Sequence, residues 1–190
     1  ARGGFRMGNQ QMVDGMIHDG LWDPYNNVHM GNCGDLCAQQ WKVTREAQDE
    51  FAKESFRRAL SAQKEGLFDA EIEPVLVPQR KGDPLAVKLD EGPGKGDASK
   101  FGSLKPAFAK DGTITAANAS SLNDGASALV LASEKAVKEH GLTPLARITG
   151  WAAAAQDPQW FTTAPAKAID KVCNKLSLKP TTVSAAPRTK

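Results

Sequence analysis

One stretch of the sequence limits the fold more than any other. From Gly112 to Gly125 the chain is rich in small and hydroxylated residues, and between Ala116 and Ser121 no side chain is larger than asparagine. Such a run lets the backbone approach another backbone or a ligand closely. The residues alone leave two interpretations equally open, a tight buried turn and a surface that contacts a ligand.

The clearest predicted helix spans residues 44–65. Thr44 suits the N-cap, and Glu46 lies in the first turn, where the helix dipole favours a carboxylate. Apolar side chains then recur at helical spacing as far as Gly66, a natural helix stop. A shorter helix is expected at about 10–19.

The middle of the chain predicts two strands and a loop. Residues 72–78 are rich in β-branched side chains and end at a proline, and residues 85–89 are expected beside them. Residues 90–103 are rich in Gly, Asp and Lys, which favours an exposed loop. Lys95 and Lys100 in this loop suit phosphate groups, although a solvated surface loop explains the same composition.

The second half alternates between expected strands and helices, a rhythm typical of a layered α/β fold. The strands are 128–132 and 145–150. One helix is capped by Ser133 and stops at Gly141, and another opens at Thr163 and Pro165. The second helix carries four apolar side chains on one face: Ile169, Val172, Cys173 and Leu176. The tail after Pro180 has no apolar periodicity and is expected to be disordered.

Composition excludes several classes of protein. The formal net charge is only +2, with basic residues scattered among acidic ones, so we expect no nucleic-acid partner. No apolar run is long enough to span a membrane, and no secretory leader is visible. Three cysteines are too few for a disulfide scaffold and fit a reducing compartment. We expect a mitochondrial or cytosolic protein, not a secreted one.

His29, Cys33 and Cys37 recur every four residues and would share one face of a helix. This spacing matches no standard zinc pattern, and Asn32-Cys33-Gly34 is expected to interrupt such a helix. Small buried cysteines are therefore favoured over a metal site, which is kept as an alternative.

Taken together, the segments resemble the thiolase family from Ala1 to about Pro180. The motifs that carry the resemblance are Arg2-Gly3-Gly4, Arg6-Met7-Gly8, Asp19-Gly20-Leu21-Trp22-Asp23, His29-Met30-Gly31, the run from Thr44 to Ala52, Glu71-Ile72-Glu73-Pro74-Val75, Leu104-Lys105-Pro106-Ala107-Phe108 and the run from Gly112 to Gly125. His29-Met30-Gly31 and the residues 118–125 are similar to the acetoacetyl-CoA branch of the family. The alternative within the thiolase family is a 3-ketoacyl-CoA thiolase that accepts a broader range of acyl chain lengths.

The resemblance implies acyl transfer through an acetyl-cysteine intermediate. Two acetyl-CoA condense to acetoacetyl-CoA and CoA, or the reverse thiolysis occurs, with CoA as substrate and no cofactor required for the chemistry. The family's nucleophilic cysteine precedes the point that matches Ala1, and its other catalytic motifs follow the point that matches Pro180. The cysteines and histidines of this chain align with none of them. We therefore expect an internal fragment without catalytic residues and without activity by itself. A non-catalytic module that binds CoA or full-length subunits is the alternative.

The family's binding residues carry over position by position. Those expected along the acyl-pantetheine path are Leu21, Tyr25, His29, Met30, Phe108, Ala116, Ser120 and Leu122. Those matching the nucleotide end of CoA are Lys95, Gly96, Asp97 and Lys100, with Lys95 in place of the family's arginine. The resemblance also implies a potassium site made by the Tyr25 hydroxyl and backbone oxygens of Ala116, Ala117 and Ala119.

The resemblance implies a domain arrangement as well. Residues 1–112 match the family's loop domain, with a tetramerisation loop near 1–8. Residues 113–143 match the end of the N-terminal core half, residues 144–180 match the start of the C-terminal core half, and 181–190 form a divergent tail. We expect a thiolase-like layered α/β fold and a homo-oligomer, either a dimer or a tetramer.

Overall fold

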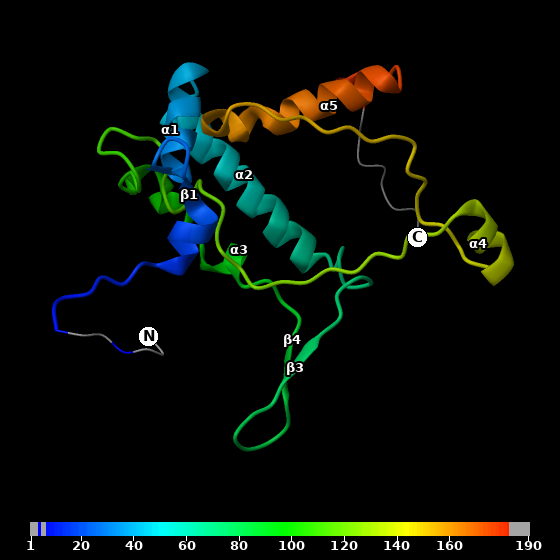
Figure 1. Cartoon of the computed structure of the whole chain (residues 1–190). Coiled ribbons are helices and arrows are strands. Elements are labelled where there is room, and N and C mark those ends of the chain that lie inside the picture. The colour runs from blue at the N-terminus through cyan, green and yellow to red at the C-terminus, as the bar shows by residue number, and fades with distance from the viewer. Residues whose placement is uncertain (1–3, 5–6, 183–190) are drawn as a thin grey trace. The chain divides into compact units, whose positions relative to one another are not determined.

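Helix α2 (Arg45–Lys64) has 20 residues in the computed structural model, which describes residue 4 and residues 7–182 (Figure 1). The Thr44 hydroxyl accepts a hydrogen bond from the Ala47 amide at 3.2 Å, as an N-cap should. At the other end Gly66 takes a positive φ of 65°, a conformation that costs glycine little. The predicted helix, its cap and its stop are all confirmed.

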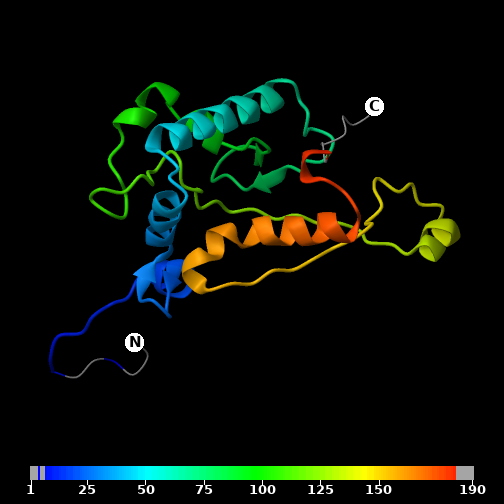
Figure 2. The same cartoon turned by 90° about the horizontal axis from the view of Figure 1, so that it is seen from above.

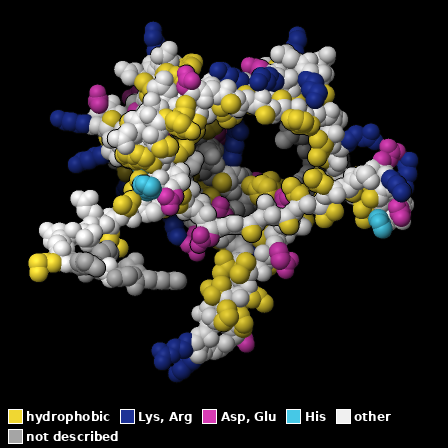
Figure 3. Space-filling view, in the orientation of Figure 1, with side chains coloured by type: hydrophobic (Ala, Val, Ile, Leu, Met, Phe, Trp, Pro, Cys, Tyr) yellow, Lys and Arg dark blue, Asp and Glu magenta, His cyan; other side chains and the backbone are white. Residues whose placement is uncertain are grey.

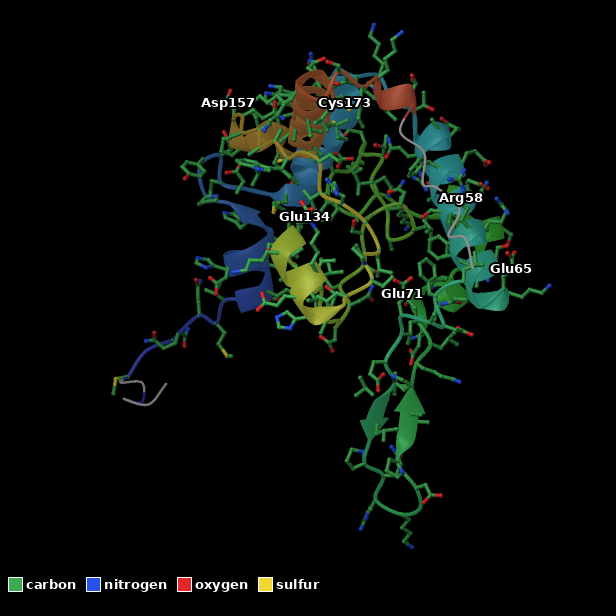
Figure 4. The ribbon with its side chains drawn as sticks, turned by 90° about the vertical axis from the view of Figure 1, so that its right-hand side faces the viewer. Arg58, Glu65, Glu71, Glu134, Asp157 and Cys173 are labelled. Atoms are coloured by element: carbon green, nitrogen blue, oxygen red, sulfur yellow. The ribbon has the colours of Figure 1, made fainter. Side chains whose placement is uncertain are left out.

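The outer face of α2 carries ion pairs one helical turn apart. Glu54 accepts hydrogen bonds from Arg57 and Arg58 at 2.6 and 2.7 Å, and these bonds lower the pKa of Glu54 to about 2. Figure 4 labels Arg58 and Glu65 along this side of the helix. These groups are solvated, so they keep the outer face polar and contribute little to stability.

Strands β3 (Val75–Val77) and β4 (Leu85–Val87) form an antiparallel hairpin, with Leu76 opposite Ala86. The two predicted strands are confirmed, although they are shorter than expected. Every residue of both strands is exposed, including Leu76 at 64% and Leu85 at 57%. Figure 3 shows apolar side chains along the hairpin and basic side chains at its tip.

The predicted loop 90–103 contains two short helices instead, α3 (Gly92–Lys95) and the 3₁₀ helix η2 (Ala98–Ser103). Asp97 starts η2 because its carboxylate accepts a hydrogen bond from the Ser99 amide at 3.1 Å. Both helices contact α2, and Figure 2 shows these green segments beside it. The loop prediction was wrong because an aspartate that suits a loop also caps a turn.

The N-terminal segment forms η1 (Ile17–Leu21), a π-helix, followed by two antiparallel two-residue strands, β1 (Trp22–Asp23) and β2 (Val28–His29). The helix predicted at 10–19 lies further along the chain, because the Asp14 carboxylate accepts hydrogen bonds from the Met16 and Ile17 amides and starts it there. Helix α1 (Met30–Gln40) follows β2.

The C-terminal segment contains α4 (Glu134–His140), η3 (Pro158–Thr163), α5 (Ala164–Lys175) and η4 (Pro180–Thr182). Ser133 caps α4 through the Ala136 amide at 3.2 Å, and Gly141 ends it with a φ of 60°, as predicted. Helix α5 starts where predicted, and Cys173 is buried on it (Figure 4), but Ile169 on the expected apolar face is 50% exposed.

Two predicted strands are wrong. Residues 128–132 and 145–150 have no strand structure, and Leu129, Val130 and Leu145 are 89%, 89% and 100% exposed. A strand is stabilised by pairing with a neighbour. Within the described residues β1 pairs only with β2, and β3 pairs only with β4.

The chain divides into two units, one of Ala1–Cys33 with Asn123–Lys190 and one of Gly34–Leu122. The tail predicted to be disordered lies mostly outside the described residues, as does most of the predicted tetramerisation loop. Among the described residues no helix is both long and apolar enough to cross a membrane. The family domain boundaries at 112, 143 and 180 stay predictions.

Candidate functional site

A partly buried ion pair on α2 holds the end of η2. Arg45 donates from Nε to Asp49 Oδ2 at 2.8 Å, and from Nη2 to the carbonyl oxygens of Phe101 at 2.8 Å and Leu104 at 3.0 Å. The side chains of Arg45 and Asp49 are only 19% and 6% exposed. Charge-assisted hydrogen bonds at low dielectric are among the stronger polar contacts in proteins. Helix α2 therefore fixes the segment that carries Lys100.

The same carboxylate holds the small-residue run. Asn118 Nδ2 donates to Asp49 Oδ1 at 3.1 Å and to the Thr113 carbonyl at 3.0 Å, while Asn118 Oδ1 accepts from the Thr115 amide at 2.7 Å. The Ala119 amide closes the turn on the Thr115 carbonyl at 2.9 Å, and Thr115 is fully buried. Residues 113–119 therefore form a hydrogen-bonded turn around one buried side chain, that of Thr115, and the contact of this run with a ligand stays a prediction.

A second set of contacts holds this turn from α1. Asp35 Oδ1 accepts from the amides of Thr113 at 2.7 Å and Ile114 at 3.1 Å, and Gln48 Nε2 donates to the Thr113 hydroxyl at 2.9 Å. A Cβ atom at Gly112 would lie 2.6 Å from Asp35 Oδ2, so only glycine leaves room for the carboxylate there. The run is therefore anchored on both α1 and α2.

The segment that carries the predicted nucleotide contacts packs on α2 through aromatic rings. Phe101 is 3% exposed, and its ring meets that of Phe56 edge-on, with centroids 5.2 Å apart. A Cβ atom at Gly96 would overlap the Phe56 ring. Glycine at this position therefore lets α3 and η2 approach the helix closely.

The charged side chains of this segment face solvent. Lys95 pairs with Glu91, and Lys100 Nζ lies 3.0 Å from Asp97 Oδ2, with the Lys100 side chain 73% exposed. Hydrogen bonds from Ser99 and Lys100 lower the pKa of Asp97. The structure thus places Gly96, Asp97 and Lys100 on one anchored segment.

Among the residues of this unit that are predicted to contact the pantetheine arm, Phe108 is half-buried, whereas Ala116, Ser120 and Leu122 are exposed.

The other residues predicted to contact the pantetheine arm lie in the unit of Ala1–Cys33 and Asn123–Lys190. Leu21, His29 and Met30 are half-buried around the β1–β2 turn, and His29 Nδ1 accepts from the Gly31 amide at 3.0 Å. Tyr25 is 82% exposed in the same turn. Asp23 starts the turn by accepting from the Tyr25 amide at 2.9 Å, and the Asn26 side-chain amide lowers the pKa of Asp23.

Cys33 is buried within α1, 2% exposed, while Cys37 is half-buried. The expected interruption at residues 32–34 was wrong, because α1 runs through Gly34 while the Ile114 side chain packs against that glycine. Burial raises the pKa of the Cys33 thiol, and the Asp23 charge raises it further. A thiol with a raised pKa is a poor nucleophile. In the part of the chain that the structure describes, no three His, Cys, Asp or Glu side chains are grouped as metal ligands.

The sequence reasoning missed the residues that hold the site together. No pattern in the sequence indicated the contacts of Asp35, Gln48 and Asn118, although Gln48 and Asn118 lie within family motifs given above. Arg45 and Asp49 did carry a signal, because Asp49 shares a helical face with Ala52 and Phe56. An acidic residue on an apolar face, four residues after an arginine, indicates a buried ion pair.

Comparison with known families gives a match over most of the chain. Residues 1–135 match the model of the thiolase N-terminal domain. The chain is 51% identical over 181 residues to an acetyl-CoA acetyltransferase of Cupriavidus necator, covering 95% of this chain and 46% of that protein. It is also 51% identical over 173 residues to acetyl-CoA acetyltransferase 2 of Arabidopsis thaliana, covering 90% and 43%.

Solved structures agree with the sequence matches. The acetyl-CoA acetyltransferase of Bacillus anthracis is 40% identical with a TM-score of 0.87, over 95% of this chain and 45% of that one. The Acat5 thiolase of Ascaris suum, solved in complex with coenzyme A, is 39% identical with a TM-score of 0.87, over 96% and 47%. The chain spans less than half the length of the relatives it matches.

Proposed function

This chain belongs to the thiolase family and has a partial α/β thiolase fold, and from that premise we propose that it serves acetyl transfer between CoA thioesters. The reaction is the condensation of two acetyl-CoA to acetoacetyl-CoA and CoA, or the reverse thiolysis. The observation that carries the proposal is 51% identity over 95% of the chain to a protein named acetyl-CoA acetyltransferase.

The chemistry follows from the family resemblance. A cysteine thiolate attacks the acetyl thioester and CoA leaves as a thiol. A second acetyl-CoA loses an α-proton, and its enolate attacks the acetyl-cysteine and releases the thiolate. Oxyanion donors stabilise the charge that develops on the carbonyl oxygens. The contribution that we propose for the residues of this chain is to bind and orient CoA.

The proposed CoA contacts fall into two groups. Lys95, Gly96, Asp97 and Lys100 bind the nucleotide end. The pantetheine arm is contacted by Leu21, Tyr25, His29, Met30, Phe108, Ala116, Ser120 and Leu122. The exposure of the Lys100 ammonium supports the first group, because a solvated lysine serves a phosphate as a mobile point charge.

Replacing Lys100 with alanine is expected to weaken the binding of CoA to this chain about tenfold. The removed ammonium is worth about 1–2 kcal/mol when it pairs with a phosphate. Binding of pantetheine, which has no nucleotide, should not change. Lys138→Ala is the matched control, because Lys138 is equally exposed and also pairs with an acid, Glu134, at 2.8 Å. Isothermal titration calorimetry tests this, and equal CoA affinity in both variants would contradict the proposal.

Replacing Ser120 with leucine tests the pantetheine contact. Ser120 is exposed, so a larger side chain should leave the thermal midpoint unchanged. If Ser120 lines the path of the arm, the added bulk is expected to lower pantetheine affinity about tenfold or more. Ser127→Leu, an exposed serine outside the turn, is the control. Unchanged affinity in a folded Ser120→Leu variant would remove Ser120 from the site.

Three further properties follow from the same family. We propose a potassium site from the Tyr25 hydroxyl and the backbone oxygens of Ala116, Ala117 and Ala119, because oxygen donors suit a hard cation. Its signature would be a higher affinity for CoA in potassium chloride than in sodium chloride. We also propose a dimeric or tetrameric assembly and a mitochondrial or cytosolic location. The absence of turnover by this chain alone stays a prediction.

A further inference from the structure

We propose that Arg45 and Asp49 act as positioning residues that set both proposed CoA-contacting segments at once. The segments are residues 95–104 and residues 113–120. This inference rests on the proposed CoA site, and it concerns how that site keeps its shape.

The Arg45 guanidinium positions the first segment, residues 95–104. Its Nη2 reaches two carbonyl oxygens at the end of η2, those of Phe101 and Leu104, at 2.8 and 3.0 Å. The Phe101 carbonyl also accepts from the Leu104 amide at 3.2 Å, so the guanidinium ties the turn that closes η2 to α2. Lys100 is the residue before Phe101, and its amide is bonded to the Asp97 carbonyl at 3.0 Å. The position of the Lys100 backbone therefore follows the position of Arg45.

The Asp49 carboxylate links Arg45 to the second segment, residues 113–120. One oxygen accepts from Arg45, and the other accepts from Asn118, which closes the small-residue turn. A carboxylate that is 6% exposed has little access to water, so its two bonds have no good substitutes. One side chain thus couples the two segments.

The aromatic contact of the same helix face supports this arrangement. Phe56 lies against Gly96 and Phe101, so α2 holds the segment near its start as well as at its end. The polar network is largely buried, whereas the Lys100 side chain on the segment that it holds is exposed. This separation between a buried support and an exposed contact is typical of a positioning role.

Arg45→Lys tests the role without removing the charge. Lysine can still pair with Asp49, but it lacks the planar fork that serves a carboxylate and two carbonyls together. We expect CoA affinity to fall about tenfold, while pantetheine affinity falls less than threefold. Arg58→Lys is the control, because Arg58 pairs with Glu54 on the exposed face of the same helix and should have no effect.

A double-mutant cycle separates positioning from general weakening. If Arg45 acts through Lys100, then Arg45→Lys should cost less than threefold in CoA affinity once Lys100 is already alanine. In Arg45→Lys hydrogen exchange should increase in residues 97–104, and in Asp49→Asn it should increase in both 97–104 and 113–119, with no change in the β3–β4 hairpin in either variant. Strictly additive losses, or wild-type exchange in both segments, would overturn the proposal.

Loss of CoA binding by the wild-type chain and loss of folding in a variant lead to different conclusions. If the wild-type chain binds no CoA, the proposed function fails, and hydrogen exchange alone then judges the coupling of the two segments. If Arg45→Lys loses its helical circular dichroism signal, Asn118→Ala takes its place, because it removes the bond from Asn118 to the Asp49 carboxylate without touching a charge. A folded Asn118→Ala variant with wild-type pantetheine affinity would also overturn the proposal.

Discussion

Replacing Asp49 with alanine is expected to lower the free energy of unfolding by about 3–5 kcal/mol. The change leaves the largely buried Arg45 guanidinium without its carboxylate and removes an acceptor from Asn118. Both α2 and the turn at 113–119 lose a support in a single step. Urea denaturation followed by circular dichroism measures the loss.

Glu54→Ala is the matched control for this prediction. It also removes an acid from α2 that pairs with arginine, but the Glu54 pair is solvated and should matter far less. If the two variants have the same unfolding midpoint, the Arg45–Asp49 pair does not stabilise the fold, and the inference built on it weakens as well.

Replacing Gly112 with alanine is expected to cost about 2 kcal/mol of stability. The new methyl group would lie 2.6 Å from Asp35 Oδ2 and 2.8 Å from Oδ1, so the carboxylate has to move. Movement breaks its hydrogen bonds to the Thr113 and Ile114 amides, and this loss exceeds the gain of up to about 1 kcal/mol from stiffening the unfolded chain.

Gly102→Ala is the control that separates the clash with Asp35 from the stiffening of the unfolded chain. A Cβ atom at Gly102 meets nothing within 4 Å, so only the unfolded chain is affected and stability should stay the same or rise slightly. Thermal unfolding of both variants is the measurement. A Gly112→Ala variant as stable as Gly102→Ala would mean that the Asp35 carboxylate adapts without loss.

Local signals in the sequence predicted α2, α4 and the start of α5, but not α1, α3 or η2. Thr44 and Ser133 each cap the helix that follows, and Gly66 and Gly141 end those helices in left-handed conformations. Such signals work because a cap bonds to amides only three residues away. The hairpin of β3 and β4 was also predictable, since its two strands are close in the sequence.

The predictions failed where structure depends on distant partners. Residues 128–132 have the composition of a buried strand, yet a strand needs a neighbour to pair with and a layer to cover it. The same limit applies to the site. Arg45 contacts the Phe101 and Leu104 carbonyls 56 and 59 residues away, and no local pattern encodes a contact of that range.

The β3–β4 hairpin has a consequence for how the protein behaves at high concentration. A two-stranded sheet has two open edges, and each edge presents backbone amides and carbonyls that no neighbouring strand satisfies. In this hairpin the edges belong to Val75–Val77 and Leu85–Val87, whose side chains also suit strand addition. Arg80 and Lys81 between the strands place like charges at the tip, where two approaching copies would repel one another. Self-association through these edges should therefore increase with salt, which screens that repulsion.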